Sequence, residues 1–574
     1  MATSTDTTGL PPDSARRGAD DRPAPTPALA QAPLAAAATT WVMHPQELGE
    51  RTAQLYADLW GLQWHGWERL LGIPDADPVS PNPADERFAD PVWSAAPGWD
   101  LLKEWYLTVS RHTKDLIRDT PDLSEKDRRR AVFWCRQWLD AVAPTNCLWS
   151  NPVAIRKALE TGGGSLAAGY RNFLADLKAG NVRMSDPADF SVGETLATTP
   201  GAVVLRNRLV EVIHYAPTRP QVYAEPVVII TPWINKFYVL DLTPKRSLVR
   251  FLLEQGLDVF ITSWKNPGAE LGGLRMDDYL LEGIQAAIEV ACHMSGARQV
   301  HAVGYCIGGT ALAMYLAWAN RRFTAADVPV ADWTLFTTLV DFEQPGDIEI
   351  FIDEASVSDL CSRMERTGYL DGRDMASAFR LLRSNGLIWH YVVHGWLYGE
   401  PPPPFDVLYW NMDTTRMPAA MHAWYLTELY LYNRLIQPGA VSLAGESLDL
   451  NAITQPLYAV AAQDDHIAPW EQAFRTINLV PGEKRFVLSS AGHILGILNP
   501  PVDPPKRTYW ADAAHCPDQA EAWKARVAPQ AGSWWDDWMT WLKPRSATLV
   551  PARPTSTADF PELAPAPGTY VREP

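Results

Sequence analysis

The spacing of hydrophobic residues divides the chain into a helical first part and a mixed second part. Leucine and tryptophan recur at near-helical spacing over residues 46–72, which predicts an amphipathic helix. Residues 1–38 are rich in Ala, Pro, Thr and Asp without a hydrophobic period, so we expect a disordered tail there. A helical N-terminal domain is expected over residues 39–190, with further helices over residues 99–118, 125–142, 152–161 and 165–177.

After about residue 190 the pattern changes to short apolar runs that alternate with helices. Several of these runs are wholly apolar, which is typical of parallel strands covered on both faces. We therefore expect residues 191–574 to form an α/β domain with a mainly parallel sheet. Strands are predicted over residues 203–209, 210–215, 227–231, 259–263, 300–304, 334–339, 457–462 and 485–489.

Residues 341 to about 435 interrupt this alternation. They are largely helical and aromatic in pattern and are broken by the proline run 401–404. An insertion between late strands of such a sheet usually covers the active site, so we expect a helical cap. A further helical subdomain without a gating role is the alternative. The tail from Ser546 is rich in Pro, Ala and Thr and is expected to be extended.

One stretch carries candidate chemistry. A strand ending at Gly304 is followed by Cys306 and then by a helix without Pro or Gly over residues 311–320. This is the pattern of a nucleophile elbow, with Cys306 where a lipase has serine, and it suggests the α/β-hydrolase fold. The helix N-terminus favours a thiolate, and the Ile307 N–H is the natural first oxyanion donor. A buried structural cysteine is the alternative.

A nucleophilic cysteine needs a base, and the base needs an orienting carboxylate. In this fold the chain order is nucleophile, acid, base. His493 lies in a loop of small residues after the last predicted strand, and Asp464 and Asp465 follow the strand before it. We expect Cys306, Asp465 and His493 to form a triad. No metal and no cofactor are expected.

Composition indicates in which compartment the protein works and which kinds of partner it can bind. A net charge of −17 argues against a nucleic-acid-binding protein. The six cysteines show no metal or disulfide spacing, which indicates free thiols in a reducing compartment. No apolar run reaches 18 residues and no signal peptide is visible, so we expect a cytoplasmic protein without a transmembrane segment. The 25 tryptophans fill the core or form a surface for an apolar partner.

From about residue 85 onward the chain carries a series of motifs in a fixed order. They are Trp138-Leu139-Asp140-Ala141, Ser150-Asn151-Pro152, Pro232-Trp233-Ile234-Asn235-Lys236-Phe237, Ser263-Trp264-Lys265-Asn266-Pro267, Gly304-Tyr305-Cys306-Ile307-Gly308-Gly309, Pro404-Phe405-Asp406-Val407-Leu408-Tyr409-Trp410-Asn411, Trp424-Tyr425-Leu426, Asp464-Asp465-His466-Ile467-Ala468-Pro469-Trp470, Gly492-His493-Ile494 and Gly532-Ser533-Trp534-Trp535. With these motifs the chain resembles the class I polyhydroxyalkanoate synthases.

The resemblance implies that the chain polymerises (R)-3-hydroxyacyl-coenzyme A into a polyester and releases coenzyme A through a Cys306 thioester. The aromatic, proline-broken composition of residues 341–435 leads us to expect that the cap gates the site and joins two protomers into a homodimer. The helical N-terminal region and the tryptophans are consistent with a granule surface as a further partner. Two other classes stay open: a cysteine-type hydrolase, either a thioesterase or a polyester depolymerase, and a granule-surface protein without catalysis. A hydrolase would release free 3-hydroxy acid, whereas a synthase would accumulate polymer.

Further site residues are expected around the triad. Asn235 lies in the loop that gives a hydrolase its second oxyanion donor, although a turn-forming role is equally consistent. Tyr238 and Asp241 are expected to support that loop. The resemblance places Arg383 near the coenzyme A path, where it could pair with phosphate, and a solvated surface arginine is the alternative. His466, next to Asp465, is a second expected substrate contact.

Overall fold

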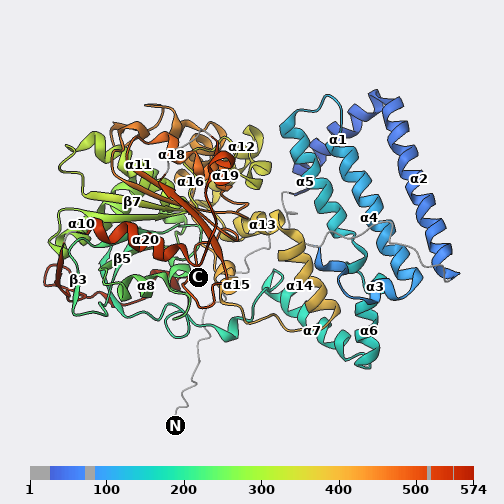
Figure 1. Cartoon of the computed structure of the whole chain (residues 1–574), viewed down its shortest axis with the longest axis horizontal. Coiled ribbons are helices and arrows are strands. Elements are labelled where there is room, and N and C mark those ends of the chain that lie inside the picture. Colours follow the sequence, from blue (N-terminus) through green and yellow to red (C-terminus); the bar gives the residue numbers. More distant parts are fainter. Residues whose placement is uncertain (1–25, 72–84, 514–518, 547) are drawn as a thin grey trace, which may run out of the picture.

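A computed structural model describes residues 26–71, 85–513, 519–546 and 548–574 of the chain (Figure 1). Helices of the N-terminal domain lie on one side and a sheet wrapped by helices lies on the other. The N-terminal helices are α1 (Thr26–Met43), α2 (Pro45–Leu70), α3 (Val92–Ala95), α4 (Pro97–Arg118), α5 (Glu125–Ala141), α6 (Pro152–Glu160) and α7 (Gly164–Ala179). The predicted helices 46–72, 99–118, 125–142, 152–161 and 165–177 match α2, α4, α5, α6 and α7 within a few residues.

The expectation of a disordered tail over residues 1–38 is wrong for residues 26–38, which belong to α1. Residues 1–25 lie outside the described residues. Alanine has the highest helix propensity, so this segment forms a helix once tertiary contacts support it. Ala37 and Trp41 are buried, and α1 packs on α5. The Trp41 Nε1 donates to the Leu116 carbonyl and to the Thr120 hydroxyl, both at 3.1 Å.

The main sheet has eleven strands in the order β15-β14-β13-β12-β7-β6-β4-β5-β2-β1-β17. The six strands from β13 to β5 are parallel to their neighbours within that group, and the strands on both flanks are antiparallel. The strands are β1 (Gly201–Arg206), β2 (Val210–Tyr215), β4 (Val227–Ile230), β5 (Val259–Trp264), β6 (Val300–Tyr305), β7 (Val330–Phe336), β12 (Leu457–Ala462), β13 (Lys484–Ser489), β14 (Thr508–Ala513), β15 (Gln530–Ala531) and β17 (Ala564–Pro565).

Helices cover both faces of the parallel strands, and the two largest clusters of buried residues lie between these layers. Strands β4, β5, β6 and β12 are buried at every position, which explains their continuous apolar runs. The covering helices are α8 (Leu248–Glu254), α9 (Met276–Asp278), α10 (Ala286–Ser295), α11 (Ile307–Arg322), α17 (Trp470–Phe474), α18 (Thr476–Leu479), α19 (Ala520–Arg526) and α20 (Trp534–Leu542). The expected α/β-hydrolase architecture with a parallel central sheet is confirmed.

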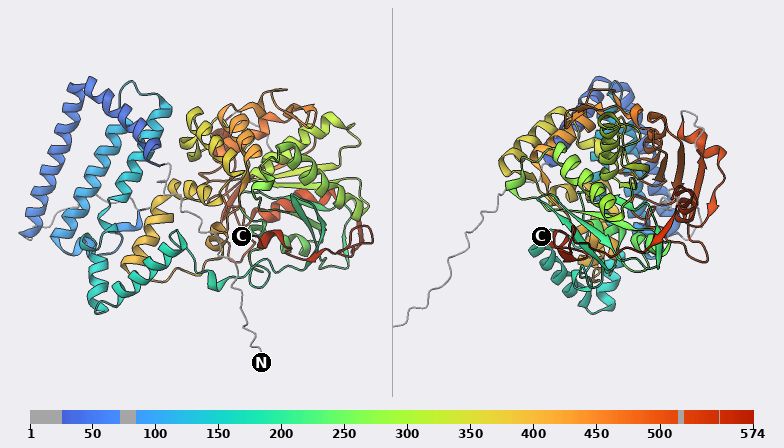
Figure 2. Two further views of the ribbon diagram at one scale, coloured as in Figure 1. Left: turned by 180° about the vertical axis from the view of Figure 1, so that it is seen from behind. Right: turned by 90° about the vertical axis from the view of Figure 1, so that its left-hand side faces the viewer.

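The insertion between β7 and β12 divides into two parts. One part stays near the sheet, whereas a π-helical stretch around α14 reaches away and packs on α7. Figures 1 and 2 show α14 beside the N-terminal helices rather than beside α12 and α16. The elements of the insertion are α12 (Glu354–Thr367), β8 (Tyr369–Leu370), α13 (Gly372–Leu382), α14 (His390–Val392), α15 (Asp406–Met412), β9 (Met417–Pro418), α16 (Ala419–Tyr425), β10 (Ser442–Leu443) and β11 (Glu446–Ser447).

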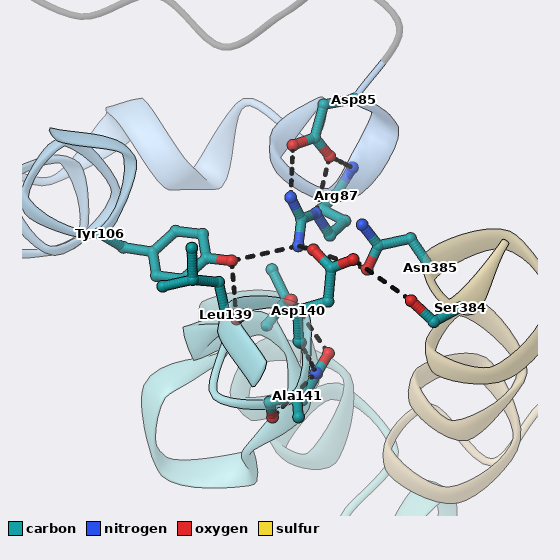
Figure 3. A network of polar contacts seen from close by, with 10 residues as sticks. Asp85, Arg87, Tyr106, Leu139, Asp140, Ala141, Ser384 and Asn385 are labelled. Carbon is teal, nitrogen blue, oxygen red and sulfur yellow. Dashed lines mark hydrogen bonds and ion pairs between the residues drawn. The ribbon is translucent and has the colours of Figure 1, made fainter. Parts of the chain in front are cut away.

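A polar network joins the N-terminal domain to the insertion (Figure 3). Arg87 donates to Asp140 at 3.2 Å and to the Asn385 side chain at 3.4 Å, and Asp85 pairs with its guanidinium at 2.7 Å. The Ser384 hydroxyl donates to the other Asp140 oxygen at 3.2 Å. These contacts fix the end of α13 against α5, so this part of the insertion is held by the N-terminal domain.

The C-terminal tail is extended, as predicted, and it adds strands to two sheets. Strand β16 (Leu549–Pro551) pairs with β3 (Gln221–Tyr223), and β17 pairs with β1 at the edge of the main sheet. The buried Lys236 then donates to the Val571 carbonyl at 2.9 Å. The tail therefore supports the loop after β4. Across the described residues, no helix is long and apolar enough to cross a membrane.

Candidate active site

Cys306 occupies a strained turn at the carboxyl end of β6. Its backbone has φ +52° and ψ −125°, outside the regions that a side-chain-bearing residue normally adopts. The turn needs glycine on both sides. A Cβ on Gly304 would lie 2.4 Å from the Gly309 Cα, and a Cβ on Gly308 would lie 2.5 Å from the Ile230 carbonyl oxygen. This close packing of β6, α11 and β4 explains the glycine pattern and leaves the Cys306 side chain partly exposed.

Helix α11 begins directly after the cysteine. The N–H groups of Gly309 and Thr310 both bond to the Cys306 carbonyl, at 2.9 and 3.2 Å. The Ile307 N–H is the first of the helix and belongs to the turn whose donors lack intrahelical acceptors. It is therefore available, with the positive end of the helix dipole, to a negative charge at this end of β6.

His493 and Asp465 meet at the adjacent strand ends. Asp465 follows β12 and His493 follows β13, and the His493 Nδ1 lies 2.7 Å from the Asp465 Oδ2. The other carboxylate oxygen accepts the N–H groups of Ile467 and Ala468 at 2.8 and 2.9 Å. Because a carboxylate only accepts, Nδ1 carries the proton and Nε2 is free to receive one. Asp464 is exposed, whereas the Asp465 side chain is fully buried.

The surroundings of His493 favour its charged form. Burial by itself lowers the pKa of His493, but the charge of Asp465, the charge of Cys306 and hydrogen bonds with both side chains raise it, and the net pKa lies above the usual histidine range. The structure thus brings Cys306 within hydrogen-bonding reach of an imidazole that is itself held by a carboxylate. The Tyr305 ring stacks on the imidazole at 5.8 Å and limits its rotation.

Tryptophans of α20 fix the loop that carries His493. The Trp534 and Trp535 indole nitrogens donate to the carbonyls of Gly496 and Ile497, both at 2.9 Å. Both rings are buried, so the core-filling interpretation holds for them. These bonds begin three residues after His493, so they determine where the loop leaves the sheet.

The loop after β4 carries the expected second oxyanion donor. Asn235 is half-buried and forms a backbone bridge with Thr414 of the insertion. The Tyr238 hydroxyl donates to Asp413 at 2.8 Å, and the Asp241 carboxylate accepts from the Ser247 hydroxyl at 2.6 Å. Burial raises the pKa of both Tyr238 and Asp241. Their partners tie the loop to the insertion and to α8, which is a supporting role.

The two expected substrate contacts lie near each other at the boundary with the N-terminal domain. Arg383 is exposed at the end of α13, and Arg136 of α5 donates to the Leu382 carbonyl at 3.2 Å. Burial lowers the pKa of His466 to about 4, and the charges of Arg383 and Arg136 add to this effect. His466 is therefore neutral at pH 7 and offers a hydrogen bond rather than a charge, so of these two expected contacts only Arg383 is suited to phosphate.

Two tyrosines of the insertion approach the cysteine, and neither was named as a site residue from the sequence. The charge of Cys306 helps to raise the pKa of Tyr425 and of Tyr430, after burial, which is the larger cause. The two rings lie 5.4 Å apart, and Phe342 lies 4.8 Å from Tyr430. The Trp424-Tyr425-Leu426 motif is a sequence signal for Tyr425, and no motif marks Tyr430. Phe342, Tyr425 and Tyr430 together are named the aromatic wall.

The parallel sheet defines the α/β-hydrolase fold, and the strained cysteine turn beside the His–Asp pair has the geometry of a nucleophile elbow with its base and acid. Comparisons with known proteins agree. Residues 226–500 match the family described as "alpha/beta hydrolase fold", and residues 84–252 match "Poly-beta-hydroxybutyrate polymerase (PhaC) N-terminus".

The chain is 40% identical to "Poly(3-hydroxyalkanoate) polymerase" of Methylorubrum extorquens, over 94% of this chain and 89% of the relative. It is 38% identical to "Poly(3-hydroxyalkanoate) polymerase subunit PhaC" of Rhizobium meliloti, over 93% and 87%. A third relative, of the same name from Cupriavidus necator, is 38% identical over 85% and 83%. The chain belongs to the poly(3-hydroxyalkanoate) polymerase family, which is a family of acyltransferases.

Proposed function

We propose that the chain polymerises (R)-3-hydroxyacyl-coenzyme A into a polyester, with the growing chain held as a thioester on Cys306. The observation that carries this proposal is the His493–Asp465 contact of 2.7 Å beside a cysteine in a strained turn at the start of α11. Family membership supports the same substrate class.

In the first step, His493 takes the proton of the Cys306 thiol and the thiolate attacks the acyl carbonyl carbon. The oxyanion that forms is stabilised by the Ile307 N–H and by the loop around Asn235. The bond between the acyl carbon and the coenzyme A sulfur then breaks, and coenzyme A leaves with the proton from His493. One thioester replaces another, so the step is close to thermoneutral.

In the second step, the 3-hydroxyl of another hydroxyacyl unit enters the site. His493 takes the hydroxyl proton, the alkoxide attacks the acyl carbon on Cys306, and the new ester forms as the C–S bond breaks. The sulfur regains the proton from His493, and the elongated chain now ends in the coenzyme A thioester of the incoming unit. A repeat of the first step transfers this chain back to Cys306 and releases that coenzyme A. Asp465 holds the imidazole in the required tautomer and stabilises the imidazolium that forms in both steps.

The competing function is hydrolysis by a thioesterase or depolymerase with the same triad. Synthesis is faster than hydrolysis only if water is kept from the acyl-enzyme. The aromatic wall of Phe342, Tyr425 and Tyr430 favours synthesis because its apolar rings limit the access of water. Incubating the purified chain with (R)-3-hydroxybutyryl-coenzyme A separates the two functions. A polymerase releases thiol together with turbidity from insoluble polymer. Thiol release with stoichiometric free 3-hydroxybutyrate and no polymer would refute the proposal.

A second part of the proposal is that the enzyme is cytoplasmic and attaches to the polyester granule through α2. Tyr56, Trp60, Trp64 and Trp67 recur at helical spacing and are 68%, 77%, 64% and 59% exposed. The opposite face of α2 packs on α4. A row of exposed aromatic rings on one helix suits an apolar surface with polar groups, such as a polyester.

A homodimer formed through the insertion completes the proposal. It rests on the aromatic, proline-broken composition of that segment. Sedimentation velocity with and without a non-hydrolysable substrate analogue tests it. Full activity of a chain that stays monomeric under both conditions would rule the dimer out.

A further inference from the structure

A cavity that is lined by none of the triad residues lies where α12 and α13 meet α16 and α5. It has a volume of about 240 Å³. Its wall is mainly apolar, with contributions from Trp134, Phe351, Val357, Leu360, Leu370 and Leu426. The cavity is thus built by the insertion together with one residue of the N-terminal domain. A concave apolar wall with a few polar groups is the usual form of a small-molecule site.

His422 is the unusual group in this wall. The residue is 1% exposed, and within the described part of the chain neither of its ring nitrogens has a hydrogen-bond partner. Burial lowers the pKa of His422 to about 4, so the ring is neutral at pH 7 and carries one N–H donor and one bare acceptor. A buried polar group without a partner destabilises the fold. An occupant of the cavity would supply the partner that the ring lacks.

The cavity lies directly behind the aromatic wall of the active site. His422 precedes Tyr425 by one helical turn, with ring centroids 6.1 Å apart. Tyr430, which is close enough to Cys306 for the sulfur charge to affect it, packs against the cluster of Ile352, Val357 and Leu426 that lines the cavity. The cavity and the active site are therefore separated by these tyrosine rings.

We propose that this cavity binds an ester-bearing segment of the 3-hydroxyacyl polyester chain, with His422 hydrogen-bonded to it. This inference rests on the proposed function, since it assumes that the enzyme carries such a chain. The imidazole N–H donates to an ester carbonyl, and the bare nitrogen accepts from the terminal 3-hydroxyl when the chain is short.

The chemistry of the wall selects this occupant. A purely alkyl group would fill the apolar space but would leave His422 without a partner. The phosphates of coenzyme A would lack a free cation, because Arg363 in the wall lies 3.3 Å from Asp359 and His422 is neutral. An aliphatic ester chain has both the apolar body and the regularly spaced carbonyl acceptors that the cavity requires.

The test measures binding without catalysis. Full-length Cys306→Ala protein is titrated by isothermal calorimetry with the linear trimer of (R)-3-hydroxybutyrate methyl ester. The same titration is made in this background with His422→Phe, which keeps a ring but removes both nitrogens, and with Leu360→Trp, which fills the cavity. His293→Phe is the matched control, because His293 is an exposed histidine on α10 that does not line the cavity.

We expect His422→Phe to weaken trimer binding about tenfold, which is the effect of one hydrogen bond in an apolar site. Leu360→Trp should abolish binding, and His293→Phe should leave it unchanged. Circular dichroism checks that each variant is folded. Trimer binding that is absent from Cys306→Ala protein, or equal in all variants, would overturn the inference. So would decanoate binding more tightly than the trimer with the same dependence on His422, because the occupant would then be a fatty acid.

Failure of this inference can be told apart from failure of the proposed function. The wild-type chain is assayed separately for thiol release and polymer with (R)-3-hydroxybutyryl-coenzyme A. If polymer forms but the trimer does not bind in a His422-dependent way, only the cavity assignment falls. If neither thiol nor polymer is produced, the proposed function falls first.

Discussion

Replacing Asp465 by asparagine tests whether the Asp465 carboxylate determines which nitrogen of His493 carries the proton. The asparagine carbonyl can still accept the N–H groups of Ile467 and Ala468, which now bond to one carboxylate oxygen at 2.8 and 2.9 Å. The loop should therefore keep its shape. The other oxygen, 2.7 Å from the His493 Nδ1, becomes an amide NH₂. Two donors cannot face each other, so the imidazole proton moves to Nε2 and the ring can no longer accept one from Cys306 or from a hydroxyl.

The size of the effect follows from this change of tautomer. In triads, the same substitution lowers kcat on the order of 10⁴-fold, which corresponds to about 5 kcal/mol in the activation free energy. We expect this loss in elongation, where an alcohol must be activated. Acylation should lose less, because a thiol is acidic enough to supply thiolate without a well-oriented base. Asp465→Asn should therefore accept one acyl group and then elongate very slowly.

Two measurements on the same protein separate these steps. Rapid-quench single-turnover assays give the first equivalent of coenzyme A, and steady-state thiol release gives elongation. Asp464→Asn is the matched control, since this neighbouring carboxylate is exposed and should behave like wild type. Equal and mild defects in both variants, or a severe defect only in Asp464→Asn, would refute the reasoning.

Three further predictions follow from the same structure. Cys306→Ala should abolish coenzyme A release while the circular dichroism spectrum is retained, because the thiol adds little packing, and more than trace turnover would exclude the thioester. Replacing Trp60, Trp64 and Trp67 by serine should release the enzyme from polymer granules in a sedimentation assay without lowering thiol release; unchanged co-sedimentation would exclude this face. Burial lowers the pKa of His422 from 6.5 to about 4, so the unfolded state binds the extra proton between these values and stability is lost as pH falls from 6.5 toward 4. Between pH 7 and pH 5 the titration of His422 lowers the free energy of unfolding by about 2 kcal/mol. In urea unfolding, the His422→Phe variant should therefore lose about 2 kcal/mol less than wild type over this pH range. Equal losses in the two proteins would contradict the burial of His422.

Much of the catalytic domain could be predicted because its strands are buried on both faces. The run 457–462 was predicted with the bounds of β12, and β6 was predicted within one residue of its end. The order of Cys306, Asp465 and His493 along the chain was informative because parallel strands present their carboxyl ends at one edge of the sheet. Local pattern and chain order were therefore sufficient for the residues that the structure brings together.

Other features depend on contacts between distant segments and have weak local signals. Helix α1 has no hydrophobic period, and its stability comes from packing on α5 and from the bonds of Trp41 to Leu116 and Thr120. Tyr425 and Tyr430 lie more than one hundred residues after Cys306, in a segment whose path could not be inferred from periodicity. The sequence also gave no indication that α14 would pack on the N-terminal domain. Such contacts are determined by tertiary packing, which overrides local propensity.

The central claim is that Cys306 carries the growing chain. The most direct measurement is the mass of the protein after quenching its reaction with a few equivalents of (R)-3-hydroxybutyryl-coenzyme A in acid, followed by peptide mapping. We expect adducts that increase by one 3-hydroxybutyryl unit at a time and map to the peptide containing Cys306. An enzyme that forms polymer while its Cys306 peptide stays unmodified, or that carries the adduct on another cysteine, would contradict it.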